Sequence, residues 1–532
     1  MAYNEEQKNT VREETLKSAI KALTDTEAPA TLIDKTYVRR VKDFLMEKGT
    51  GQDKHFASLL SEDTLLKWEN YFELNNRTKN VGELKVAYFS GPNPENDIRV
   101  LNNLGILPEN VWAFESENQI YTAAVMAALE SEFPYIKIHK GKIQNFLQYS
   151  PIRFDIIYLD FCATITSIQT IPVVTAIFEK QALNSPGALI TNFAYPNPQL
   201  NPEQWLNTIK LGVNYLYPKR FTESFEDLGG DWSETQSVFG NTPEDVLELG
   251  KENPFNIYSQ FVTRVIMDLG AYIVPVQRFT KSFAWKLFFN QPSANVNLPE
   301  DYNMSLVEFP DNHPIISGLS NLLPFKDGYS DADLTDDPDQ DIEAIIDNDF
   351  PPFLEKFVKL LSTDSNAETL LDKLKKMDFL MDENDEAEKY YSDALNKISE
   401  NWDWESLHVF CDVFLFHQIK DVLVRQLSVP YHYNIEASKR WVYQAQQTPM
   451  FQDLFVFDDC RYLYDWMPTI DMFENSVTVL ERQMILRFIL DGLSKHRFYY
   501  NSEFLGGTAV VSNDKPGFEV KELLPRKHIQ TD

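Results

Sequence analysis

Short apolar runs alternate with helical stretches between residues 84 and 196, and this rhythm predicts alternating strands and helices. The fourth run, FDIIYLDF, is the most hydrophobic and predicts a fully buried strand. The helical stretches have the length of crossover connections, so we expect the strands to form a parallel sheet. The predicted strands are residues 84–90, 110–116, 135–141, 154–161 and 185–196.

Two further apolar segments, AYIVPVQRF and KSFAWKLFFNQ, follow a helix predicted at residues 253–270. We expect these segments to be adjacent strands that close the sheet as a hairpin near residue 290. Residues 1–80 show helical spacing of apolar residues instead. The predicted organisation is an N-terminal helical segment (1–80), an α/β domain (81–292) with an insertion at about 200–253, an acidic linker (293–350) and a mostly helical, aromatic-rich domain (351–532).

Composition limits the class of protein. The chain has 532 residues, 43% of them hydrophobic, which predicts a multidomain globular protein. Its net charge of −31 argues against general nucleic-acid binding, because phosphate contacts need lysine and arginine. Three scattered cysteines form no disulfide framework, and the polar N-terminus has no secretory pattern, so we expect a cytoplasmic protein. No apolar run is long enough to span a bilayer, so no membrane partner is expected.

The order of five strand–helix steps, a helix and a hairpin resembles the class I S-adenosylmethionine-dependent methyltransferase fold, a Rossmann-like fold. The resemblance covers about residues 84–290, and it implies a seven-stranded α/β sheet whose last strand is antiparallel. The segment SPGALITNF resembles the family's entry to the fifth strand. The implied cofactor is S-adenosyl-L-methionine.

The loop after the first predicted strand, SGPNPEND, stands where that family has a glycine-rich cofactor loop. Glycines in such a loop let backbone N–H groups approach the ligand. This loop keeps one glycine, and its two prolines lack an N–H group. Side chains are therefore expected to supply the missing hydrogen bonds. The predicted cofactor contacts in this loop are Ser90, Gly91, Asn93 and Asn96.

Glu115 ends the second predicted strand, 24 residues after Gly91. In the resembled family an acidic residue at this place accepts hydrogen bonds from the ribose hydroxyls, and the spacing fits other dinucleotide-type folds. The neighbouring Ser116 is included in the predicted site. After the third strand the family often has an acidic residue against the adenine amine, where this chain has a lysine. The predicted adenine contacts are Gly141, Lys142 and Ile143.

Asp160 and Phe161 follow the fourth predicted strand, where the resembled family has its substrate-facing motif. An aspartate there can orient the acceptor or take its proton, and Phe161 can stack on a planar substrate. The sequence DFCA is similar to the DPFGS motif of tRNA guanine-N2 methyltransferases, but Phe161 stands where that family needs proline. Cys162 is predicted to be a small buried hydrophobe rather than a nucleophile.

Two classes of function remain open from the sequence. One is methyl transfer to a nitrogen or oxygen acceptor, with a nucleic acid or a protein as substrate. The other is a catalytically degenerate scaffold or nucleotide-binding subunit of a multi-protein complex, with protein partners on the C-terminal domain. The altered cofactor loop and the long C-terminal extension favour the second, whereas Glu115 and the unbroken order of elements favour the first.

The rest of the chain offers weaker candidates. The acidic run at 327–350 is predicted to be a solvated linker rather than a calcium site, because the central glycine and closing glutamate of a calcium loop are missing. His408, Cys411 and His417 are predicted to be core residues, so no metal site is expected. The segment YHYNIEASKRWVYQ mixes basic and aromatic residues, a composition found in nucleic-acid grips and more often in protein contacts.

Overall fold

The computed structural model describes residues 5–25, 61–75, 78–216, 253–299, 350–400, 429–458 and 525–529, apart from short gaps inside some of these ranges, and isolated positions between 35 and 58. Of the predicted acidic linker (293–350), residues 293–299 and Phe350 are described, whereas its acidic run at 327–349 and the group around His408 lie outside the described residues.

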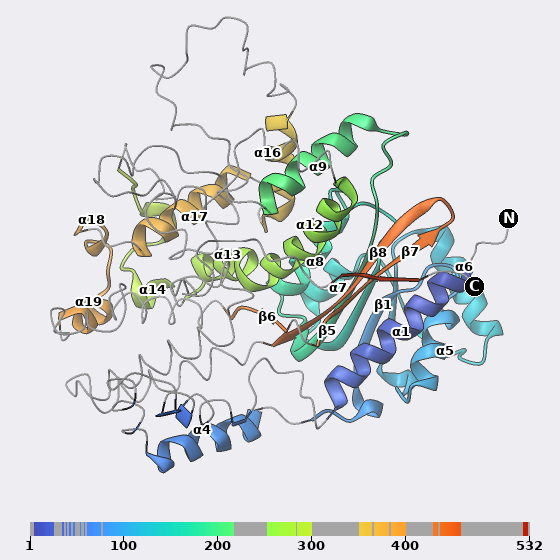
Figure 1. Cartoon of the computed structure of the whole chain (residues 1–532), viewed down its shortest axis with the longest axis horizontal. Coiled ribbons are helices and arrows are strands. Elements are labelled where there is room, and N and C mark those ends of the chain that lie inside the picture. The colour runs from blue at the N-terminus through green and yellow to red at the C-terminus, as the bar shows by residue number, and fades with distance from the viewer. Residues whose placement is uncertain are drawn as a thin grey trace, which may run out of the picture.

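Nine described strands form one mixed sheet with helices on both of its faces (Figure 1). The strand order is β3-β2-β1-β4-β5-β8-β7-β9, and β6 pairs with β8 beside this path. The first five strands are parallel, and β8 is the one described strand that runs against the others. The protein is therefore Rossmann-like and α/β, as the sequence predicts. The strands are β1 (Val86–Phe89), β2 (Val111–Glu115), β3 (Lys137–Lys140), β4 (Phe154–Asp160), β5 (Leu183–Ala194), β6 (His432–Tyr433), β7 (Lys439–Ala445), β8 (Thr448–Asp458) and β9 (Lys527–His528).

The strands that follow β5 in the sheet correct the sequence prediction. Residues 269–288, expected to be mostly strand, form a π-helical turn and the helices α13 and α14. The hairpin that joins β5 is instead β7 and β8, about 245 residues further along the chain than β5. Short apolar runs fit a buried helix as well as a strand, so the hydrophobicity of these segments alone does not decide between the two.

Helices pack on both faces, because alternate residues of each strand point to opposite sides. In β4, Ile156 and Tyr158 join the core under α1 and α5, whereas Ile157 and Leu159 join the core under α8 and α12. The helices are α1 (Glu5–Thr24), α4 (Glu62–Asn75), α5 (Glu95–Asn103), α6 (Asn118–Glu130), α7 (Ile143–Tyr149), α8 (Thr170–Glu179), α9 (Pro202–Leu216), α12 (Pro254–Asp268), α13 (Val274–Lys281), α14 (Trp285–Phe288), α16 (Phe350–Leu361), α17 (Ala367–Met381), α18 (Asp385–Glu388) and α19 (Asp393–Glu400).

Helices α16 to α19 confirm that residues 350–400 are helical, and they pack against α8, α9, α13 and α14. The later described residues form strands β6 to β9, which contradicts a helical prediction for those positions. Residues 401–428 and 459–524 lie outside the described residues, so helical structure there stays a prediction. None of the described helices is long and apolar enough to cross a membrane.

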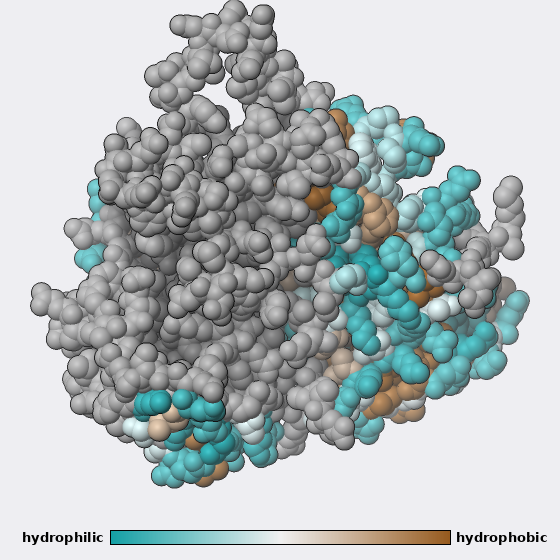
Figure 2. Space-filling model, in the orientation of Figure 1, coloured by the Kyte–Doolittle hydropathy of each residue, from teal (hydrophilic) through white to brown (hydrophobic). Residues whose placement is uncertain are grey.

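Helix α1 lies across β5, β7 and β8 (Figure 1). Its inner face buries Val11, Leu16 and Ile20, which follow helical spacing. A line of polar contacts fixes the helix along the sheet: Thr15 accepts a hydrogen bond from Gln452 at 2.8 Å, and Gln7 accepts one from the backbone of Gln444 at 2.9 Å. The outer surface on this side is largely hydrophilic, with a few apolar residues (Figure 2).

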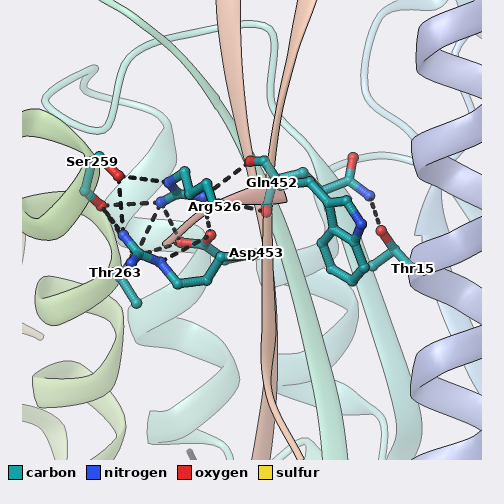
Figure 3. Close-up of polar contacts among 8 residues, drawn as sticks. Thr15, Ser259, Thr263, Gln452, Asp453 and Arg526 are labelled. Atoms are coloured by element: carbon teal, nitrogen blue, oxygen red, sulfur yellow. Dashed lines mark hydrogen bonds and ion pairs between the residues drawn. The ribbon is translucent and has the colours of Figure 1, made fainter. Parts of the chain in front are cut away.

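On the other face of β8, a buried arginine fastens the C-terminal segment (Figure 3). Arg526 is ion-paired with Asp453 and donates to Ser259 Oγ at 2.7 Å on α12. Arg440 donates to the same serine at 3.1 Å. The two guanidinium groups thus share one carboxylate in the core. Because an unpaired buried charge is costly, these residues hold α12, β7, β8 and residues 525–529 together.

Candidate functional site

The carboxyl ends of β3, β2, β1 and β4 lie side by side, and most of the predicted site residues stand on this edge. Phe89 is level with Phe114, Glu115 with Lys140, and Tyr88 with Tyr158. In open α/β sheets this edge is where ligands bind. The structure therefore brings the ends of four predicted strands to one place.

The loop after β1 holds an unsatisfied polar atom. The backbone N–H of Ser90 donates to the Phe114 carbonyl at 3.2 Å. The Ser90 hydroxyl is buried, and it has no hydrogen-bond partner in the described part of the chain. A buried hydroxyl without a partner costs free energy, so its position favours a bound polar group that the chain does not supply.

Gly91 has a φ of +56°, a conformation that suits glycine, and a Cβ there would have nothing within 4 Å. This leaves open space at Gly91, the residue after Ser90. Asn93 is exposed and Asn96 is half-buried. Helix α5 begins after Pro94, which provides no side-chain cap, and Asn96 lies within its first turn.

Glu115 ends β2, as predicted. One carboxylate oxygen accepts a hydrogen bond from the backbone N–H of Glu117 at 2.8 Å, which fixes the side chain at the start of α6. For the second oxygen, the described residues provide no partner. Ser116 is exposed next to it. A carboxylate held on one side and open on the other can accept hydrogen bonds from a ligand's hydroxyl groups.

The turn after β3 lies against Glu115. The Gly141 N–H donates to the Glu115 carbonyl at 2.8 Å, and Gly141 has a φ of +134°. Lys142 is the exposed residue before α7, and Ile143 is buried. These three residues therefore stand beside Glu115, the position that the sequence predicted for an adenine pocket.

Asp160 ends β4 and is held by two partners. Its carboxylate lies 2.6 Å from the ammonium of Lys8 on α1, and it accepts a hydrogen bond from the Asn192 amide at 2.7 Å. Burial alone would raise the pKa of Asp160, but Lys8 and Asn192 together lower it below its usual value. The group is therefore an anion at neutral pH. It can orient a donor, and it is a weak proton acceptor.

A second charged pair lies close to the first. The Arg12 Nε lies 2.8 Å from a carboxylate oxygen of Asp97 on α5. Burial raises the pKa of Asp97 to about 6, although Arg12 opposes this, and the nearby Asp160 adds to the increase. Two basic side chains of α1, those of Lys8 and Arg12, thus form ion pairs with two acidic residues near the carboxyl edge. Sequence analysis missed this role of α1, because the charges of a polar helix do not indicate which partner they meet.

Phe161 and Cys162 differ from the predictions. The Phe161 ring is stacked on Phe193 with centroids 5.3 Å apart, and it meets Phe89 edge-on at 5.5 Å. The Phe193 ring therefore covers one face of Phe161 that a planar substrate would use. Cys162 is exposed rather than buried. Desolvation of its sulfur and the charge of Asp160 raise the pKa of its thiol, which makes it a poor nucleophile.

The basic and aromatic segment 431–444 is mostly core. Tyr431, Tyr433 and Trp441 are buried, and so is Arg440. Rings packed in the core in this way favour protein contacts, the commoner of the two interpretations, over a nucleic-acid grip. Only Lys439 of the basic pair is exposed. No group of three potential metal ligands occurs among the residues that the structure describes.

Comparisons with known proteins name no relative. The chain matches no protein family and no curated protein. Among solved structures, the chain is similar to a possible exported protein from Bordetella parapertussis, with 13% sequence identity and a TM-score of 0.17. The matched region covers 37% of this chain and 73% of the Bordetella chain. At this TM-score the likeness carries no argument about fold or function.

Proposed function

We propose that this protein binds S-adenosylmethionine at the carboxyl edge of its sheet and transfers the methyl group to a nitrogen or oxygen acceptor. The observation that carries the proposal is the combination on one edge of the partnerless Ser90 hydroxyl and the half-free Glu115 carboxylate. An adenosyl ligand has hydroxyl and amino groups that match these acceptors. The sheet order, in which the antiparallel strand β8 follows five parallel strands, also supports it.

Several residues would hold this cofactor. Glu115 would accept hydrogen bonds from the ribose hydroxyls of the cofactor. Ser90 would form a hydrogen bond with a polar group of the cofactor, and Gly141 and Ile143 would border its adenine. When bound, the cofactor supplies a methyl group on a positively charged sulfur. Asp160 would orient the acceptor by accepting its N–H or O–H, and positioning of this kind is a large part of catalysis in bimolecular reactions.

Lys8 sets a condition on this mechanism. The ammonium of Lys8 now holds the Asp160 carboxylate at 2.6 Å. An acceptor that bonds to this oxygen of Asp160 therefore has to displace the Lys8 ammonium, which a change of the flexible lysine side chain would allow. The acceptor's proton leaves to solvent, because the low pKa of Asp160 makes it a poor store for that proton.

A cofactor-binding subunit without turnover is the second candidate. The ion pair of Asp160 with Lys8 and the packing of Phe161 on Phe193 favour it, because both put protein groups where a substrate is expected. Binding is common to the two candidates, and formation of S-adenosylhomocysteine separates them. Product formation with nucleic-acid or protein fractions supports the enzyme, whereas binding without product supports the scaffold.

The test of the shared claim is calorimetric titration of the full chain with S-adenosylmethionine and S-adenosylhomocysteine. Wild type is expected to bind both. Glu115→Ala should weaken binding about tenfold or more, because two hydrogen bonds to a charged group are lost. Glu117→Ala is the matched control, since the side chain of Glu117 is exposed and its role is in the backbone. A folded wild-type protein that binds neither compound would overturn the proposal.

A further inference from the structure

A pocket of about 450 Å³ lies away from the carboxyl edge, between α1, β7 and the C-terminal segment. Its walls come from three parts of the chain that are far apart in sequence. Tyr433, Trp441 and Pro525 provide its apolar surface. A volume of this size is within the range of small-molecule sites.

The charged residues on its wall are mostly basic. Among the described residues that line the pocket are three lysines, Lys17, Lys439 and Lys527, and one carboxylate, that of Glu14. Glu14 accepts hydrogen bonds from Lys527 at 2.7 Å and from the indole of Trp441 at 3.0 Å. Within the described part of the chain, Lys17 and Lys439 therefore have no carboxylate in direct contact.

Those two groups have little else to bind. Lys439 donates to the Ser18 hydroxyl at 3.2 Å. Lys17 has no ion pair or hydrogen bond within the described ranges. In a chain with a net charge of −31, uncompensated lysines gathered around one pocket stand out. A concave surface that concentrates one sign of charge attracts ligands of the other sign.

The floor of the pocket adds to this positive charge. Arg440 lines the pocket. It shares the carboxylate of Asp453 with the buried Arg526. Burial, and to a lesser extent the neighbouring Arg526, lowers the pKa of Arg440 to about 9.

We propose that this pocket binds a small organic phosphate, with the phosphate on Lys17 and Lys439 and the organic part against Trp441 and Pro525. Phosphate carries the charge that the two ammonium groups lack, and lysine is a common phosphate ligand. The apolar surface accounts for an organic part rather than a free inorganic ion. The site is separate from the proposed cofactor edge and does not depend on it.

The test uses phenyl phosphate, with phenol and inorganic phosphate as the two halves of its chemistry. Calorimetric titration of the full chain should give binding of phenyl phosphate that is tighter than that of either half. The double variant Lys17→Ala/Lys439→Ala should weaken it about tenfold or more. The double variant Lys356→Ala/Lys359→Ala changes the net charge equally on α16 and should bind like wild type.

A change of opposite sign makes the test sharper. Glu14→Gln removes the one carboxylate of the pocket and releases Lys527, so phenyl phosphate should bind severalfold more tightly. No binding by wild type, or equal binding by the two double variants, would overturn the proposal. A phosphate on a lipid headgroup presents the same chemistry, so phosphatidylcholine vesicles with and without phosphatidic acid form a further arm. Binding to the acidic vesicles alone would contradict a small-molecule ligand.

The outcome is distinguishable from that of the cofactor proposal. Glu115→Ala should leave phenyl phosphate binding intact, and the Lys17→Ala/Lys439→Ala variant should leave S-adenosylhomocysteine binding intact. If both ligands were lost in the same variant, the two sites would not be independent, and this proposal would fail.

Discussion

The ammonium of Lys8 on α1 lies 2.6 Å from the carboxylate of Asp160 at the end of β4. These residues are far apart in the sequence, and their contact places the N-terminal helix over the acidic group on which the proposed chemistry depends. Helix α1 is therefore both part of the core, through its apolar face, and a neighbour of the candidate site.

Removing the ammonium should make the protein less stable at neutral pH. In Lys8→Met the Asp160 carboxylate stays buried without its cation, so its pKa should rise and the free energy of unfolding at pH 7.5 should fall by about 1–3 kcal/mol. The wild-type pair stabilises above the unfolded pKa of the aspartate and is lost as the pH falls through the lower folded value. Urea denaturation of both proteins at pH 7.5 and pH 4 measures the difference, which should shrink at pH 4. A deficit that stays constant with pH, or no deficit, would contradict this account of the pair.

Asp97 should produce a pH dependence of the opposite sign. Its folded pKa of about 6 lies above its ordinary value, so the folded state keeps the proton more readily than the unfolded state. The stability from this group is complete below about pH 4 and is lost as the pH rises to about 6.

Asp97→Asn cannot titrate, so it isolates this contribution. Between pH 4 and pH 7 the difference in unfolding free energy between the two proteins should change by about 2–3 kcal/mol in favour of the variant. Denaturant titrations across this range provide the values. A change in favour of wild type as the pH rises would show that the Arg12 pair dominates the group.

Arg526 should be a major contributor to stability, although it lies six residues from the end of the chain. Arg526→Met leaves the buried carboxylate of Asp453 without its closest cation, so unfolding should become about 3–5 kcal/mol easier. The neighbouring Lys527 forms an exposed pair with Glu14, and Lys527→Met should cost about 0–1 kcal/mol. Thermal and urea unfolding of the two variants measure how much stability is lost at each of these adjacent positions. Equal effects would contradict the central place of Arg526 in the core.

The first five strands were predictable from the sequence because each is a short apolar run followed by a helical connection. The hairpin β7–β8 was not, because its two-residue turn contains Gln446 with a φ of +56° and no glycine or asparagine to mark it. The apolar segments AYIVPVQRF (271–279) and KSFAWKLFFNQ (281–291) predict the hairpin, but the structure forms a π-helical turn and the helices α13 and α14 there. The hydrophobic pattern of these segments correctly predicts that most of their apolar residues are buried. It does not predict which segment pairs with β5, because that pairing is made with residues far along the chain.

The residues of the candidate site also divide into those that the sequence predicts and those that it does not. Glu115 and Asp160 were found because strand ends are marked by a change from apolar to polar residues. Lys8 and Arg12 were not found, because their partners lie on β4 and α5, and nothing in the sequence of α1 indicates that contact. Phe161 was given a substrate role from its position, but the packing of Phe89 and Phe193 around it depends on three strands at once.

The most direct test of the central claim is a crystal structure of the full chain with S-adenosylhomocysteine. We predict ligand density at the carboxyl edge, with the ribose hydroxyls on the free oxygen of Glu115, a polar group on the Ser90 hydroxyl and the adenine next to Gly141 and Ile143. Density at another place, or crystals grown at saturating ligand with this edge empty, would contradict the claim that it is a cofactor site.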